Sequence, residues 1–196
     1  MERVERSSIW IKKKRLKRLY RTIPKGSHVV CFDEFGPLEL RPHYGAHWAR
    51  QRHPQRLPAT YTRKNGVRHF LSFYDLRHDR LWGYFFQRKR HHETLRALQR
   101  LRKMYPKKQP IYLILDNFAP HKKSVVRQWA KENNIIFVWT PTNASWLNRI
   151  ECQFTELKQY SLDNTFFKTH AELQQTVKKF LRYRNARNKK KKKSLP

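Results

Sequence analysis

Three acidic residues are placed where they could share one chemical task. Asp33 ends one strongly apolar segment, Asp116 ends another, and Glu151 lies near the start of a predicted helix after the next strand. In an open α/β sheet, side chains that follow the carboxyl ends of strands project beyond the packed core, which is where ligands bind. If the two strands are neighbours, we expect the three carboxylates to converge at one edge of the sheet.

Carboxylates that are gathered in one place repel one another unless a cation lies between them. Mg²⁺ and Mn²⁺, which prefer oxygen ligands, are the natural counter-charges. Two such ions about 3.5–4 Å apart can activate a water or a 3′-hydroxyl and stabilise the leaving oxygen of a phosphodiester. A glycosidase-type acid and base is less attractive, because the many Lys and Arg residues favour ionised carboxylates.

Each acid also has a purely structural interpretation. Asp33 alone could be a turn acid, and the alternation of side chains along a strand leaves open whether Asp33 or Glu34 faces the site. Asn148 and Glu151 fit a capping box, with Asn148 as the N-cap and Glu151 at the third helical position. His121, in a Pro-His turn, is either an ordinary turn or surface residue or a catalytic group.

The chain is unusually basic, with 45 Lys and Arg residues against 14 Asp and Glu residues and a formal net charge of +31. Self-repulsion of this size is costly unless a polyanion is the working partner, and nucleic acid is the obvious candidate. An anionic membrane surface is a weaker one, because no apolar stretch approaches the ~20 residues of a spanning helix.

The cysteines and the N-terminus indicate the compartment. Cys31 and Cys152 form no close pair with the spacing of a metal or redox motif. The basic N-terminus lacks the uninterrupted apolar core of a secretory signal. We therefore expect a cytoplasmic, nucleoid-associated protein.

The pattern of apolar residues predicts the elements that position the acids. Continuous or alternating apolar runs predict strands at 28–36, 67–74, 81–86, 111–115 and 135–139. The second and third of these form an antiparallel hairpin. Amphipathic segments predict helices at 10–20, 94–104, 122–133, 149–160 and 171–183. This order predicts an α/β fold with a mixed sheet, whose later strands run parallel because helices connect them.

We expect three regions along the chain: a basic arm or linker at 1–27, one folded domain at 28–187, and a basic tail at 188–196. Five consecutive lysines should leave the tail disordered. The arm is a helix whose basic side chains either are simply solvated or contact phosphates. The residues proposed for that contact are Lys12, Lys13, Lys14 and Arg15.

Three segments resemble the signature blocks of insertion-sequence transposases in the mariner superfamily, enzymes with an Asp-Asp-Glu triad. The segments are Phe32–Gly36, Leu115–Lys122 and Ser145–Glu151. They occur in the family's order, and the 34 residues between Asp116 and Glu151 match the family's spacing. The resemblance extends from about residue 29 to residue 185, nearly the whole chain outside its basic ends.

The resemblance implies a ribonuclease H-like fold in which Asp33, Asp116 and Glu151 hold Mg²⁺ or Mn²⁺, with two ions expected. It favours Asp33 over Glu34 as the metal ligand on the first strand. The implied reaction is metal-dependent DNA cleavage at transposon ends, followed by joining of a 3′-hydroxyl to target DNA, commonly at TA. Asn117 and His121 belong to the second block, so they are candidates for groups around the ligands.

Two tryptophans, Trp48 and Trp146, lie near the site in the resemblance and are candidate DNA contacts. Full-length relatives carry an N-terminal helix-turn-helix region that recognises element ends, whereas about 30 residues precede the first strand here. The chain therefore resembles the catalytic half alone, from a truncated copy or from one of two reading frames. A separate helix-turn-helix chain and a homodimer are both compatible with this reading.

Two other functions deserve comparison with the transposase. A non-catalytic DNA-binding remnant would hold DNA through its basic surface, and an RNA-directed nuclease of the same fold would prefer hybrid substrates. The remnant and the enzyme both predict salt-sensitive binding, because neutralised phosphates release counterions. Only metal-dependent nicking separates them.

Overall fold

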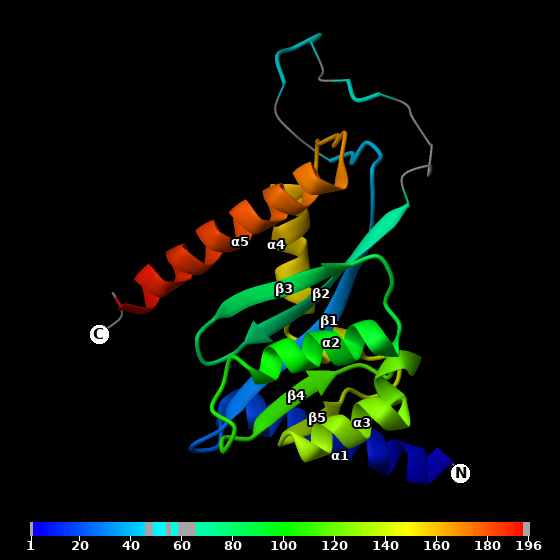
Figure 1. The fold of residues 1–196 in the computed structure, drawn as a ribbon, viewed down its shortest axis with the longest axis vertical. Helices are drawn as coiled ribbons and strands as arrows, with labels where there is room; N and C mark the ends of the chain where they lie inside the picture. Colours follow the sequence, from blue (N-terminus) through cyan, green and yellow to red (C-terminus); the bar gives the residue numbers. More distant parts are fainter. Residues whose placement is uncertain (1, 46–48, 54–55, 59–65, 194–196) are drawn as a thin grey trace.

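The computed structural model describes residues 2–45, 49–53, 56–58 and 66–193, and Trp48 lies outside them. Five strands form one sheet in the order β3-β2-β1-β4-β5. Their bounds are β1 His28–Glu39, β2 Val67–Asp75, β3 Arg80–Phe86, β4 Ile111–Leu115 and β5 Ile135–Trp139. The first three strands pair antiparallel, and β4 pairs parallel with β1 and β5. This confirms the predicted mixed α/β sheet (Figure 1).

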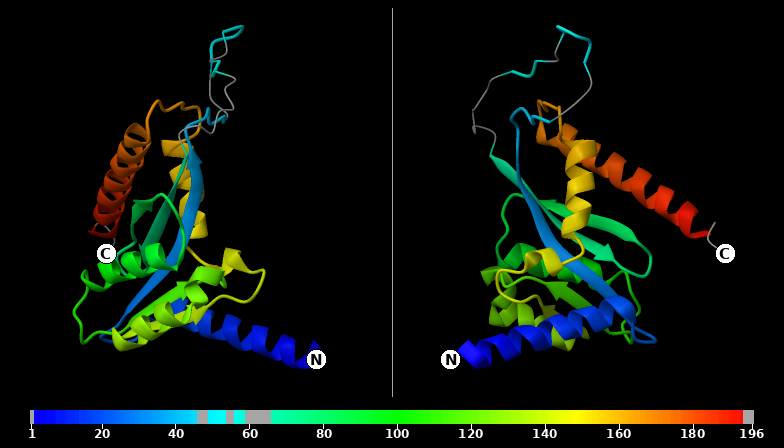
Figure 2. Two further views of the ribbon diagram at one scale, coloured as in Figure 1. Left: turned by 45° about the vertical axis from the view of Figure 1, so that its right-hand side comes forward. Right: turned by 180° about the vertical axis from the view of Figure 1, so that it is seen from behind.

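Helices cover both faces of the sheet. The α-helices are α1 Glu2–Arg21, α2 His91–Arg102, α3 Ser124–Glu132, α4 Glu151–Ser161 and α5 His170–Lys193. Two 3-10 turns, η1 and η2, span Ala119–Lys122 and Ser145–Leu147. α2 and α3 lie on one face, and Figure 2 shows α1 and α4 on the opposite face. α5 packs along α4 and against β3.

The central strand β1 separates two hydrophobic cores. Val30 and Phe32 lie in the core beneath α2 and α3. Val29 and Cys31 lie in the core that α1, α4 and α5 close. All four side chains are fully buried, which explains why this strand reads as a continuous apolar run and not as an alternating one.

α1 is packed against the sheet by its apolar side. Leu16 is 1% exposed and belongs to the core beneath α1 and α4. Near the end of the helix, the Tyr20 hydroxyl donates a hydrogen bond of 2.6 Å to the carbonyl of Leu147. The Arg149 guanidinium lies 4.4 Å from the centre of the Tyr20 ring. The helix thus supports the segment that leads into α4.

α5 remains helical through Lys193, where the lysine run had predicted disorder from residue 188. The physical reason is that Lys is a good helix former, and extending an existing helix avoids the cost of nucleation. Among the described parts of the chain, no helix has the combined length and hydropathy that crossing a membrane requires.

A buried arginine joins α4 and α5 to the β2–β3 turn. Arg184 is 2% exposed, and its guanidinium donates to the Asp79 carbonyl at 3.0 Å and to the Asp79 carboxylate at 2.8 Å. Its Nε lies 3.5 Å from the Glu156 carboxylate on α4. The same guanidinium also bonds to Gln153 on α4. Arg184 therefore helps fix the helix that begins with Glu151.

We expect Arg184→Met to lower the free energy of unfolding by roughly 1–3 kcal/mol, because its half-buried partners lose their donor while most of the aliphatic volume is kept. Urea denaturation measures this loss. Arg182→Met on the exposed side of α5 is the matched control and should change stability by less than about 0.5 kcal/mol. Equal losses in the two variants would contradict the assigned role.

Candidate active site

The parallel pairing of β1 with β4 places Asp33 level with Asp116. Cys31 pairs with Ile114, and the same offset aligns Asp33 with Asp116, which is the first residue after β4. Neighbouring strands are about 4.8 Å apart. The two carboxylates therefore extend from adjacent strands at the same end of the sheet, as the spacing of the apolar runs predicted.

Glu151 is the first residue of α4, on the face to which Asp33 points. Asp33 has the same parity along β1 as Cys31, whose side chain lies in the core closed by α1 and α4. Burial raises the pKa of Asp33 to about 7, and the negative charges of Glu34, Glu151 and Asp116 add to this rise. A hydrogen bond of 2.8 Å from the Glu34 backbone N–H opposes it. The other two acids predicted from the sequence are thus close enough to raise the pKa of Asp33.

Asn148 does not cap α4, so the capping-box interpretation of Asn148 and Glu151 is wrong. The helix begins at Glu151, Ile150 occupies the N-cap position, and no side chain caps the end. The fully buried Asn148 instead donates from Nδ2 to the Phe32 carbonyl on β1 at 3.0 Å. A buried carbonyl requires a hydrogen-bond donor. The long-range hydrogen bond that Asn148 makes to Phe32 therefore takes the place of the local capping bond that the sequence pattern predicts. Asn148 thereby connects the start of α4 to the strand that carries Asp33.

We expect Asn148→Ala to cost roughly 1–3 kcal/mol in the free energy of unfolding, because the Phe32 carbonyl loses a buried donor. Urea denaturation checks this. The control is Gln128→Ala, which removes an exposed hydrogen bond of 3.0 Å to Glu132 and should cost less than about 0.5 kcal/mol. If Asn148→Ala lost no more stability than the control, the hydrogen bond from Asn148 to Phe32 would not have the stabilising role assigned to it.

His121 is buried between two acids. Its Nε2 lies 2.7 Å from Oε1 of Glu34, and its Nδ1 lies 3.1 Å from Oδ1 of Asp116. The His121 side chain is 0% exposed, and that of Glu34 is 7% exposed. The turn or surface residue considered from the sequence is therefore a core residue in contact with the site.

The contact with His121 shifts two pKa values in opposite directions. Burial alone would lower the pKa of His121, but the close contact with Asp116, the hydrogen bond with Glu34 and the charges of both carboxylates raise it to about 9. Burial alone would raise the pKa of Asp116, but His121 and the Phe118 backbone N–H, which donates at 3.1 Å, hold it below its ordinary value. Asp116 is therefore stabilised as a carboxylate.

Two further residues surround the end of β4. Asn117 donates from Nδ2 to the Thr140 carbonyl at 2.8 Å and so connects the end of β4 to the end of β5. Lys89 lies between β3 and α2, with its Nζ 4.6 Å from the centre of the Phe118 ring. Its charge contributes to the low pKa of Asp116. Sequence reasoning missed Lys89, because nothing distinguishes one lysine in so basic a chain.

The other candidates are more exposed. Trp146 lies in η2, shortly before α4, and is 69% exposed. Lys13, Lys14 and Arg15 are exposed on α1, and Lys14 Nζ lies 4.8 Å from the centre of the Trp10 ring. Lys12, on the same helix, is half-buried.

The donor set fits a hard divalent cation. Within the described residues, no three His, Cys, Asp or Glu side chains lie close enough to hold an ion in this conformation. However, burial and, less strongly, neighbouring negative charges raise the pKa of Asp33, and a cation beside it would offset both effects. Carboxylate oxygens are the ligands that Mg²⁺ and Mn²⁺ prefer. The residues that would hold the ion are Asp33, Asp116 and Glu151.

Comparison with solved structures identifies the fold. The Mos1 strand transfer complex matches with a TM-score of 0.67 at 14% identity, over 95% of this chain and 58% of that chain. The Mos1 mariner paired end complex with Mg matches with a TM-score of 0.67 at 13% identity, over 92% and 55%. The catalytic domain of Mos1 mariner transposase matches with a TM-score of 0.63 at 11% identity, over 97% and 89%. These similarities confirm the predicted ribonuclease H-like fold.

The chain spans about 58% of the length of the Mos1 chain in the strand transfer complex. A search of the curated proteins found no match. The family model described as DDE superfamily endonuclease matches residues 28–174, well over half of the chain. That segment contains all five strands and the three acids. The chain therefore belongs to the DDE superfamily endonuclease family.

Proposed function

We propose that this chain is the catalytic domain of a transposase, which cleaves DNA at transposon ends and joins the 3′ ends to target DNA. Asp33, Asp116 and Glu151 would hold the Mg²⁺ or Mn²⁺ ions, with two ions expected from the family resemblance. The observation that carries this proposal is the parallel register of β1 with β4, which sets Asp33 level with Asp116 in a chain that matches an endonuclease family.

Divalent cations, when bound, supply Lewis-acid activation of a water or 3′-hydroxyl and stabilisation of the leaving oxygen. The chain's own residues prepare the site for this chemistry. Asp33 is half-buried, while the close contact with His121 favours the ionised form of Asp116. Lys89 adds a positive charge beside Asp116, where it would attract the phosphodiester.

We expect Asp33→Asn, Asp116→Asn and Glu151→Gln each to reduce Mn²⁺-dependent nicking of supercoiled plasmid by more than about 100-fold, because several kcal/mol of transition-state stabilisation are lost. Binding to the same DNA, measured by anisotropy, should be retained. Glu132→Gln on the exposed side of α3 is the control and should nick normally.

The alternatives give different results in this assay. A wild-type chain that binds DNA but never nicks it with Mg²⁺ or Mn²⁺ would favour the non-catalytic remnant. Preferential cleavage of an RNA–DNA hybrid would favour the RNA-directed nuclease. Nicking that persists in all three acid variants would exclude these residues as the catalytic set.

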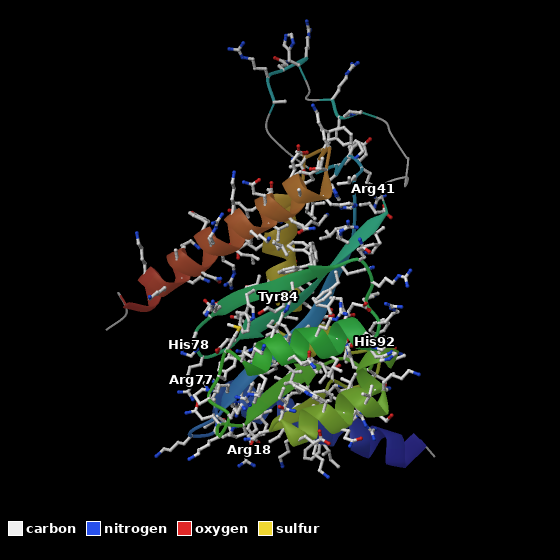
Figure 3. All side chains as sticks on the ribbon, viewed as in Figure 1. Arg18, Arg41, Arg77, His78, Tyr84 and His92 are labelled. Carbon is white, nitrogen blue, oxygen red and sulfur yellow. The ribbon has the colours of Figure 1, made fainter. Side chains whose placement is uncertain are left out.

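The basic surface supports DNA as the partner. Figure 3 shows side chains that end in nitrogen on many elements, with Arg18 and Arg77 in the lower part of the view and Arg41 in the upper part. On α1, Lys13, Lys14 and Arg15 extend into solvent, whereas the opposite side of the helix packs on the sheet. We infer that this outer side of α1 contacts DNA phosphates. Trp146, exposed next to the segment that opens α4, is the described tryptophan we assign to DNA contact.

Neutralising Lys12, Lys13 and Lys14 to Ala should weaken DNA binding equally for unrelated sequences and reduce the slope of log affinity against log salt by about 3, since phosphate contacts carry no sequence information. Anisotropy titrations at several salt concentrations measure both quantities. A matched control neutralises three exposed lysines at the amino-terminal end of β4, away from the acids: Lys103, Lys107 and Lys108. A sequence-dependent loss, or an equal loss in the control, would contradict the phosphate-contact role.

The finer assignments follow the family resemblance. We propose that the target is TA-containing DNA, that the chain works as a homodimer on paired ends, and that a separate helix-turn-helix chain recognises the ends. The expected place of action is the cytoplasm, at the nucleoid.

A further inference from the structure

Glu34 shares the first block with Asp33 but lies on the other side of the strand. Successive side chains of β1 alternate, so Glu34 points to the face covered by α2 and α3. There it is almost fully buried, with its Oε1 2.7 Å from His121 Nε2. A buried carboxylate is costly unless it is paired, so this contact calls for a function or a strong structural reason.

The imidazole of His121 contacts two carboxylates and two aromatic rings. Both of its ring nitrogens face carboxylates, Glu34 at 2.7 Å and Asp116 at 3.1 Å. The Phe32 ring lies 5.2 Å from it, centre to centre, and the Phe118 ring lies 5.5 Å from it at 81°. Because the ring packs among these four groups, it cannot rotate without losing a contact, and its Nδ1 stays beside Oδ1 of Asp116.

We propose that Glu34 and His121 are positioning residues, which orient the Asp116 carboxylate for binding a divalent cation. Glu34 fixes the orientation of the imidazole, and the imidazole fixes Oδ1 of Asp116. The inference rests on the proposed function only in taking Asp116 as a ligand. Partners that orient ligands in this way typically change metal affinity by about 10–100-fold.

The test is Mn²⁺ affinity, measured by isothermal titration calorimetry on the chain without DNA. An Asn side chain can place its amide nitrogen near the position of His Nδ1, and a Gln side chain can place its own near the position of Nε2. His121→Asn can therefore keep the contact with Asp116 and lose Glu34, whereas His121→Gln does the reverse. We expect His121→Gln to weaken Mn²⁺ binding about 10–100-fold and His121→Asn to weaken it less.

Glu34→Gln gives an independent measurement, because it preserves the shape of the side chain and removes the charge that orients His121. We expect it to weaken Mn²⁺ binding about tenfold. The control is His28→Gln, at the opposite end of β1, where His28 Nε2 lies 2.6 Å from Gln109. This control should bind Mn²⁺ like the wild type. Urea denaturation of every variant records its stability separately from its affinity.

The outcomes separate the two proposals. Mn²⁺ binding lost in Asp116→Asn but unchanged in His121→Gln and Glu34→Gln would overturn the positioning role and leave the proposed function standing. Unchanged binding in Asp116→Asn would overturn the proposed function itself. Equal loss in His121→Asn and His121→Gln would also overturn positioning, since it would indicate core packing alone. If His121→Gln does not fold, the comparison of Glu34→Gln with His28→Gln decides the question in the same way.

Discussion

The site depends first on the parallel pairing of β1 with β4. This pairing brings two segments more than 80 positions apart in sequence into register, so that Asp33 and Asp116 leave the sheet at the same level. A slip of one residue would turn every side chain of one strand to the opposite face. The buried runs Val29–Phe32 and Leu113–Leu115 make such a slip costly, because cores lie on both faces. The geometry of the acids is thus secured by packing that takes no part in chemistry.

The acids of the site are unequal although their sequence contexts are similar. Asp116 has a buried imidazole beside it, which lowers its pKa, whereas burial and, less strongly, three negative neighbours raise the pKa of Asp33 to about 7. The imidazole reaches the site from the α2 and α3 face, while Asp33 points to the other face and has no such partner within the described residues. A divalent cation beside Asp33 would favour its carboxylate form.

Much of this architecture could be predicted from the sequence, because strands buried on both faces leave continuous apolar runs and the acids end those runs. The acids themselves stood out because the chain contains only 14 Asp and Glu residues. Long-range contacts could not be predicted. Asn148 hydrogen-bonds to Phe32 and does not cap α4 in the way that the local sequence pattern predicts. The burial of His121 beside Glu34 depends on two segments that meet only in the folded chain. A run of lysines predicts disorder from charge repulsion, whereas α5 extends through the run because adding residues to an existing helix needs no new nucleation.

Through the contacts of Tyr20 with Leu147 and Arg149, α1 packs against the segment that leads to the site. One side of that helix presents lysines to solvent, and its end holds the short segment that leads to Glu151. Because Tyr20 contacts both Leu147 and Arg149, a displacement of the end of α1 would disturb the segment that leads into α4 at Glu151.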